Sequence, residues 1–99
     1  MLKFSNCLLN NQLLSTELTE ILLVGKVNTP RSAEEGKYAY GFIDSRINNH
    51  RVVGHGGNLP GACSNLDIFI DLGYTAVVLS NSSHDCIRVK IKIRETLLN

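Results

Sequence analysis

The chain has 99 residues, of which 43% are hydrophobic and 19% are charged, and its formal net charge is +1. This length suits one small domain or part of a larger one, and this composition excludes a disordered protein. The near-neutral charge gives no reason to expect nucleic acid or an anionic membrane as a partner. No apolar run approaches the roughly 20 residues that a membrane span needs.

The first quarter of the chain, residues 1–25, predicts two short helices. Residues 2–11 place apolar side chains at loosely helical spacing. Ser15 is a good N-cap for a second helix, and Gly25 stands where that helix should end. The polar segment 26–37, with one proline and one glycine, is then expected to be a surface loop.

Residues 38–81 predict an antiparallel sheet of about four strands. Four runs rich in β-forming residues are separated by connections short enough for antiparallel neighbours; they cover residues 38–44, 50–55, 64–70 and 74–81. The last run contains TAVVL, which is apolar on both faces. We therefore expect that strand to be covered from both sides.

The segment 84–98 gives conflicting signals. Its central part, IRVKIKIR at 87–94, alternates apolar and cationic residues, which by itself predicts a strand. The length of the segment and its ending, ETLLN, allow a terminal helix. The four cations are expected to form a solvated face rather than a site for an anionic partner; they are Arg88, Lys90, Lys92 and Arg94.

The three cysteines, Cys7, Cys63 and Cys86, include no Cys-x-x-Cys pair, so a zinc knuckle and a redox pair are both unsupported. We expect three buried, reduced thiols, which weakly favours a reducing compartment. The N-terminus is a poor signal peptide because Asn and Ser interrupt its short apolar stretch. The localisation of the intact protein stays unknown.

Residues 50–66, HRVVGHGGNLPGACSNL, followed by GYTAVVLSN at 73–81, resemble the C-terminal sheet of the β-lactamase-related serine hydrolases. This family contains class C β-lactamases, penicillin-binding D-peptidases and lactamase-like esterases. Its third motif is Lys-Thr-Gly in many members and His-Gly-Gly in others, and His55-Gly56-Gly57 matches the second form. YAYGFID at 38–44 is similar to the family's Tyr-Gly-Tyr-Gly-Phe strand, and residues 2–26 resemble its preceding helix pair. The resemblance covers nearly the whole chain.

The resemblance implies a partial β-lactamase/penicillin-binding-protein-like fold, in which 84–98 is a helix packed on the sheet. It also implies acyl-enzyme hydrolysis of a small-molecule amide or ester by the intact protein, with no cofactor. Such a reaction needs backbone N–H groups aimed at the developing oxyanion. Gly56 and Gly57 have no Cβ to block the substrate, and Asn58 carries the candidate oxyanion N–H. His55 stands where other members have a lysine that can hold a substrate carboxylate.

The family's other catalytic motifs do not occur in this sequence. No serine has lysine three residues later, and no serine or tyrosine has asparagine two residues later. We therefore expect a C-terminal fragment of such a hydrolase that is inactive alone. The alternative is a non-catalytic interaction module that self-associates through an open sheet edge.

Two independent chemistries are weaker hypotheses. His55, Ser64 and Asp67 supply the atom types of a catalytic triad, but no Gly-x-Ser-x-Gly elbow accompanies them. A metal site is not expected either, because three of its five candidate ligands are consecutive and cannot easily converge; the candidates are His50, His55, His84, Asp85 and Cys86.

Overall fold

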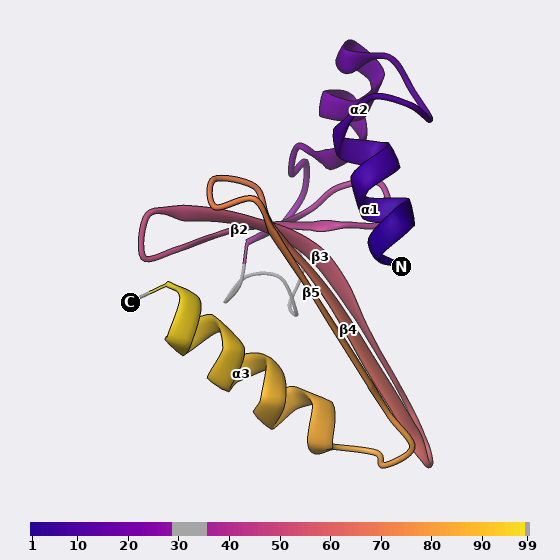
Figure 1. Cartoon of the computed structure of the whole chain (residues 1–99), viewed down its shortest axis with the longest axis vertical. Coiled ribbons are helices and arrows are strands. Elements are labelled where there is room, and N and C mark those ends of the chain that lie inside the picture. Colours follow the sequence, from indigo (N-terminus) through magenta and orange to yellow (C-terminus); the bar gives the residue numbers. More distant parts are fainter. Residues whose placement is uncertain (29–35, 99) are drawn as a thin grey trace.

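The chain folds into three layers, with helices on both faces of one antiparallel sheet (Figure 1). The computed structural model describes residues 1–28 and 36–98. Its elements, in chain order, are α1 (Leu2–Leu9), α2 (Thr16–Leu23), β1 (Lys37–Tyr38), β2 (Ile43–Ile47), β3 (His50–Leu59), β4 (Ala62–Phe69), β5 (Tyr74–Ser80) and α3 (Asp85–Leu97). This is the expected α+β fold.

The expected surface loop 26–37 falls mostly on residues 29–35, which lie outside the described residues. Within the described residues, no helix is both long enough and apolar enough to cross a membrane.

The sheet has five strands in the order β1-β2-β3-β4-β5, one more than expected. The difference lies in residues 38–44, which form a tight hairpin instead of a single strand. The N–H of Ala39 donates to the carbonyl of Phe42 at 2.7 Å, and Gly41 has a φ of +80° that favours glycine. The chain therefore reverses here, and β1 pairs antiparallel with β2.

Strand β3 is longer than the run 50–55 that the sequence predicts. It continues to Leu59, so the His-Gly-Gly motif lies inside a strand and not in the connection to the next one. The turn to β4 contains only Pro60 and Gly61. Gly61 has a φ of +80°, and proline followed by such a glycine is typical of a type II turn.

On one face of the sheet, α1 and α2 cover a small apolar core. Ser15 caps α2 as predicted, since its Oγ accepts a hydrogen bond from the N–H of Leu18 at 3.2 Å. The buried core residues on this face come from both helices, the β1–β2 hairpin and β3; they are Leu8, Leu23, Ala39, Phe42 and Val53. Burial of these side chains holds the helix pair against the sheet.

Asp44 of β2 ties the end of α2 to the sheet. Its Oδ2 accepts a hydrogen bond from the N–H of Gly25 at 3.0 Å, just after the helix. Its Oδ1 accepts one from Nε of Arg51 at 2.9 Å, and Arg51 also reaches Glu20 of α2 at 3.2 Å. The hydrogen bond to Asp44 raises the pKa of the Arg51 guanidinium above its ordinary value, which keeps this contact charged.

On the opposite face lies α3, so the alternating pattern at 87–94 forms a helix and not a strand (Figure 1). Its second half packs against the sheet through apolar residues around a buried core of Val52, Phe69 and Leu98. Asn48, in the β2–β3 turn, also donates to the carbonyl of Leu98 at 3.1 Å. The helix that the resemblance implies for 84–98 is therefore confirmed, whereas the period-two alternation alone predicts a strand.

Two of the four cations on α3 point inward, so the expectation of one solvated cationic face is wrong for them. Arg94 donates from Nε and Nη2 to the two carboxylate oxygens of Asp67 at 2.7 and 2.9 Å. Their side chains are only 15% and 3% exposed. Lys90 lies one helical turn before Arg94 and is also partly buried, whereas Arg88 and Lys92 are exposed.

The expectation of three reduced thiols is wrong as well, because a disulfide joins Cys63 of β4 to Cys86 of α3. After β5, the chain returns the start of α3 to the side of β4, and the two Cα atoms are 6.0 Å apart. That separation is usual for a disulfide. Cys7 is a free, partly buried cysteine.

Strand β5 is an edge strand of the described sheet, and the expectation that it is covered on both faces is wrong. Leu79 is 70% exposed and Val77 is 37% exposed. By register these residues lie opposite Ser64 and Leu66, on the sheet face that α3 does not cover. The apolar composition of β5 therefore marks an uncovered surface.

The buried pair of Asp67 and Arg94 yields a stability prediction. Replacing Arg94 by Met leaves the Asp67 carboxylate buried without its bidentate partner, which should lower the free energy of unfolding by roughly 3 kcal/mol. Urea denaturation measures this change, with the exposed Arg88→Met as the matched control. The double variant Asp67→Leu/Arg94→Met should recover most of the loss, because it buries no charge. Equal stability of Arg94→Met and Arg88→Met would contradict the prediction.

Candidate functional site

The last part of β3 has a free edge, which we call the edge segment (residues 55–59). Strand β2 pairs with β3 only as far as Gly54, whereas β4 continues to pair with it as far as Leu59. In the described part of the chain, no strand pairs with the other side of these residues. All residues of the edge segment are exposed. Their backbone is therefore accessible to an extended ligand on that side.

The glycines around the edge segment have two distinct roles. A Cβ on Gly54 would lie 1.8 Å from the backbone oxygen of Leu66, so this glycine is required by the close approach of β4. A Cβ on Gly57 would meet only the side-chain Oγ of Ser64, at 3.1 Å. Gly57 therefore leaves open space in front of the strand and is not needed for its pairing.

A groove of about 580 Å³ runs between the edge segment and the first turns of α3. Volumes of this size are typical of small-molecule sites. Five elements contribute its lining, and among the described residues no aspartate or glutamate is part of it; the lining residues are Tyr38, Ile43, His55, Gly56, Gly57, Asn58, Ser64, Asn65, Cys86, Ile87 and Lys90. The groove brings together all four residues that the resemblance singles out, His55 to Asn58.

Tyr38 of β1 positions His55 at one end of this groove. The Tyr38 hydroxyl and Nε2 of His55 are hydrogen bonded at 3.1 Å. The two rings also meet edge to face, with centroids 5.8 Å apart, an arrangement that aromatic rings favour. The imidazole is therefore held at the mouth of the groove by the hairpin that precedes β2.

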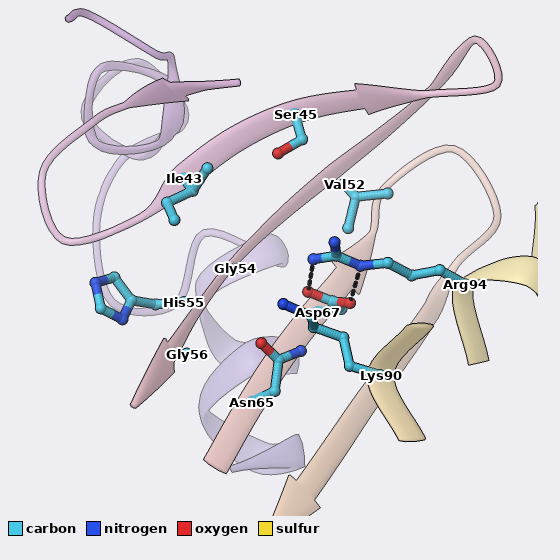
Figure 2. Close-up of a pocket in the computed structure, with 10 residues that line it drawn as sticks. All are labelled: Ile43, Ser45, Val52, Gly54, His55, Gly56, Asn65, Asp67, Lys90 and Arg94. Atoms are coloured by element: carbon cyan, nitrogen blue, oxygen red, sulfur yellow. Dashed lines mark hydrogen bonds and ion pairs between the residues drawn. The ribbon is translucent and has the colours of Figure 1, made fainter. Parts of the chain in front are cut away.

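A buried polar cluster lies beside the groove (Figure 2). Figure 2 shows Arg94 reaching from α3 to Asp67, while Lys90 extends from the same helix toward Asp67 and Asn65. Asn65 and Asp67 are buried on β4. Because Arg94 fixes α3 over Asp67, Lys90, one turn earlier on the helix, lines both this cluster and the groove.

The structure separates the candidate triad. His55 lies opposite Leu66 in the ladder and Asp67 lies opposite Gly54, so the two side chains leave opposite faces of the sheet. Asp67 is bound by Arg94, and His55 by Tyr38. In residues 1–28 and 36–98, no group of three or more His, Cys, Asp or Glu side chains is placed to hold a metal ion.

The sequence reasoning missed the groove residues outside the His-Gly-Gly motif. Lys90 was expected on a solvated cationic face and Ile87 was given no role in a site, whereas the helical spacing of Cys86, Lys90 and Arg94 places them on one side of α3. Tyr38 was assigned to a continuous strand, and only the reversal at Gly41 brings it next to His55. No local sequence pattern predicts both the reversal at Gly41 and the contact between Tyr38 and His55.

Comparisons with known proteins support the fold. No protein-family model matches this sequence, and no curated protein matches it significantly. Among solved structures, the chain is similar to a penicillin binding protein from Bacillus halodurans, with a TM-score of 0.86 and 22% sequence identity. The match covers 98% of this chain and 29% of that protein. The chain therefore has the fold of one part of a penicillin-binding protein.

The two kinds of glycine can be told apart by substitution. Gly54→Ala should lower the free energy of unfolding by about 2–3 kcal/mol or more, because its Cβ overlaps the backbone of β4. Gly57→Ala should change the free energy of unfolding by less than about 1 kcal/mol, because the Ser64 side chain can rotate away. Alanine also loses less backbone entropy than glycine when it is fixed in a strand. Urea denaturation of both variants tests this, and equal losses would contradict the assignment.

Proposed function

We propose that this chain is the substrate-binding sheet of a β-lactamase-like serine hydrolase, which cleaves an amide or ester through an acyl-enzyme in the intact protein. The observation that carries the proposal is the edge segment, where His55-Gly56-Gly57-Asn58 runs along a groove and no strand of the described chain pairs with its free side. The fold of one part of a penicillin-binding protein supports it.

The chemistry of acyl transfer explains why an open strand suits this role. Attack on the carbonyl carbon moves negative charge onto its oxygen, and fixed backbone N–H groups stabilise that charge without reorganising. Gly56 and Gly57 let the substrate carbonyl approach the strand closely. Among the described residues, a Cβ on either glycine would meet only atoms of Ser64 and Asn65. In the proposal, the N–H of Asn58 is the oxyanion donor.

The charge of the groove favours a substrate with an anionic group. Among the described residues, its lining includes His55 and Lys90 and no carboxylate side chain. A substrate carboxylate would gain charge-assisted hydrogen bonds there, and His55 would take the part played by lysine in other members of the family. Its hydrogen bond to Tyr38 fixes the ring for that contact.

The nucleophile belongs to another part of the intact protein in this proposal. Ser64 lines the groove, but no lysine stands three residues after it to activate it. The chain spans only 29% of the length of the penicillin-binding protein that it resembles. The chain alone is therefore expected to be inactive, and its partner is a small-molecule amide or ester.

A chimera tests the oxyanion assignment. In it, this chain replaces the matching part of the Bacillus halodurans protein, and covalent labelling by a fluorescent penicillin is measured. Asn58→Pro removes the backbone N–H and should slow labelling by roughly 10²–10³-fold. Asn58→Ala keeps the N–H and should label at nearly the original rate.

Circular dichroism checks that both chimera variants fold. The isolated chain, treated with the same fluorescent penicillin, is the control that should not become labelled. Equal labelling of the Pro and Ala variants would refute the role of the Asn58 N–H. Labelling of the isolated chain that disappears in Ser64→Ala would refute the proposed origin of the nucleophile.

A second candidate function is a non-catalytic interaction module, and β5 is the observation that favours it. This strand has one unpaired edge in the described sheet and carries no charged residue. Charged residues, prolines and bulges normally protect such edges from pairing with another chain. In this alternative, two copies associate through their β5 edges.

Sedimentation of the isolated chain tests self-association. If β5 mediates it, Leu79→Lys should shift dimers to monomers, because a lysine on an edge strand opposes pairing. Leu13→Lys is the matched control, since Leu13 is also an exposed leucine but lies between α1 and α2. Monomers at every concentration, or equal effects of the two substitutions, would remove this alternative.

A further inference from the structure

We propose that Asn65 is a specificity-determining residue of the groove, where its side-chain amide binds an amide group of the ligand. The role of this subsite in substrate selection rests on the proposed function, which it deepens. The binding of an amide at Asn65 depends only on the groove itself, so it can be tested without any reaction.

Asn65 lies on β4, on the side of the sheet that faces α3. It stands opposite Gly56 in the β3–β4 ladder, and it lines both the groove and the buried polar cluster beside it. The residue is only 6% exposed. Its amide is therefore removed from bulk water but remains in contact with the space that a ligand would fill.

The Asn65 amide differs from its neighbours in the row of β4 side chains that face α3. Cys63, two residues earlier, is bonded to Cys86. Asp67, two residues later, is held by Arg94. Among the described residues, no hydrogen bond reaches the Asn65 side chain (Figure 2). Buried polar side chains are nearly always hydrogen bonded, and a ligand group that enters the groove can supply this bond.

Gly56 provides the space through which a ligand reaches this amide. A Cβ at Gly56 would lie 3.2 Å from Oδ1 of Asn65 and 3.5 Å from the backbone oxygen of Ser64. A side chain at this position would therefore stand directly over the amide and cover it. With glycine there, the amide stays open to the groove.

The chemistry of the subsite favours a neutral amide over a charged group. The carboxamide of Asn65 offers two N–H donors and one carbonyl acceptor, which match the carbonyl and the N–H of another amide. An anion would instead come close to the buried carboxylate of Asp67, on the same face of β4. A second negative charge in a space with so little water is unfavourable. The subsite should therefore select an uncharged amide.

This subsite is separate from the anionic contact proposed at His55. By register, the side chains of His55 and Asn65 leave opposite faces of the sheet. A ligand that crosses the free edge of β3 can therefore place a carboxylate beside His55 and an amide beside Asn65. The substrate class that follows is an acyl compound with both groups.

Titration of the isolated chain with benzamide, followed by NMR, tests the subsite. The side-chain amide signals of Asn65, assigned by their loss in Asn65→Leu, should shift saturably. Acetophenone, which has a methyl group in place of the amide nitrogen, and the anion benzoate should bind about tenfold more weakly. Asn65→Leu should weaken benzamide binding by about the same factor. Asn6→Leu, at an exposed asparagine of α1, is the matched control and should leave binding unchanged.

The stability of Asn65→Leu distinguishes a ligand-binding amide from a structural one. Leucine has nearly the shape of asparagine, so replacing an amide without a partner should leave the midpoint of urea denaturation unchanged or raise it. A lower midpoint would show that the amide supports the fold and would overturn the inference. So would the absence of a saturable shift, equal binding of benzamide and acetophenone, or unchanged benzamide binding in Asn65→Leu.

Failure of this inference can be told apart from failure of the proposed function, because the titration needs no nucleophile. Benzamide binding at Asn65, together with equal labelling of the two Asn58 chimera variants, would keep the subsite and refute the oxyanion role. Slower labelling of the Asn58→Pro chimera without benzamide binding would keep the oxyanion role and refute the subsite.

Discussion

The position of α3 depends on one buried charge. Asp67 lies on a central part of β4, where an unpaired carboxylate would be strongly unfavourable. Arg94 compensates it with a bidentate contact that permits only a narrow range of positions for the helix. Lys90 and Ile87 then fall at the groove because they precede Arg94 on the same helix. The buried ion pair of Asp67 and Arg94 thus determines which α3 side chains line the groove.

The second constraint is the distance between β3 and β4. Gly54 lets the two strands approach where any side chain would collide with the backbone of Leu66. Immediately after Gly54, β2 stops pairing and β3 becomes an edge toward the groove. Close packing and open access therefore alternate within a few residues of one strand. This arrangement is why a glycine-rich sequence occurs in the middle of a sheet.

Local patterns in the sequence were sufficient for the fold class, the helix N-cap at Ser15 and the antiparallel sheet, because hydrophobic spacing and capping act over a few residues. They failed where the deciding partner is distant. Arg94 was placed in solvent because its partner is 27 residues away, and Cys63 was taken as reduced because Cys86 approaches it only after β5 returns. The groove lining on α3 was missed for the same reason, whereas the residues of the edge segment came from the family resemblance.

The order of the strands also matters for how the chain reaches this structure. Each strand of the sheet pairs with its neighbour in the sequence, and the β2–β3 and β3–β4 connections contain only two residues each. Closing such short loops requires little loss of chain entropy, so the sheet can form as successive hairpins. Low contact order of this kind favours rapid folding. The longer-range packing of α1, α2 and α3 is then made onto a sheet that already exists.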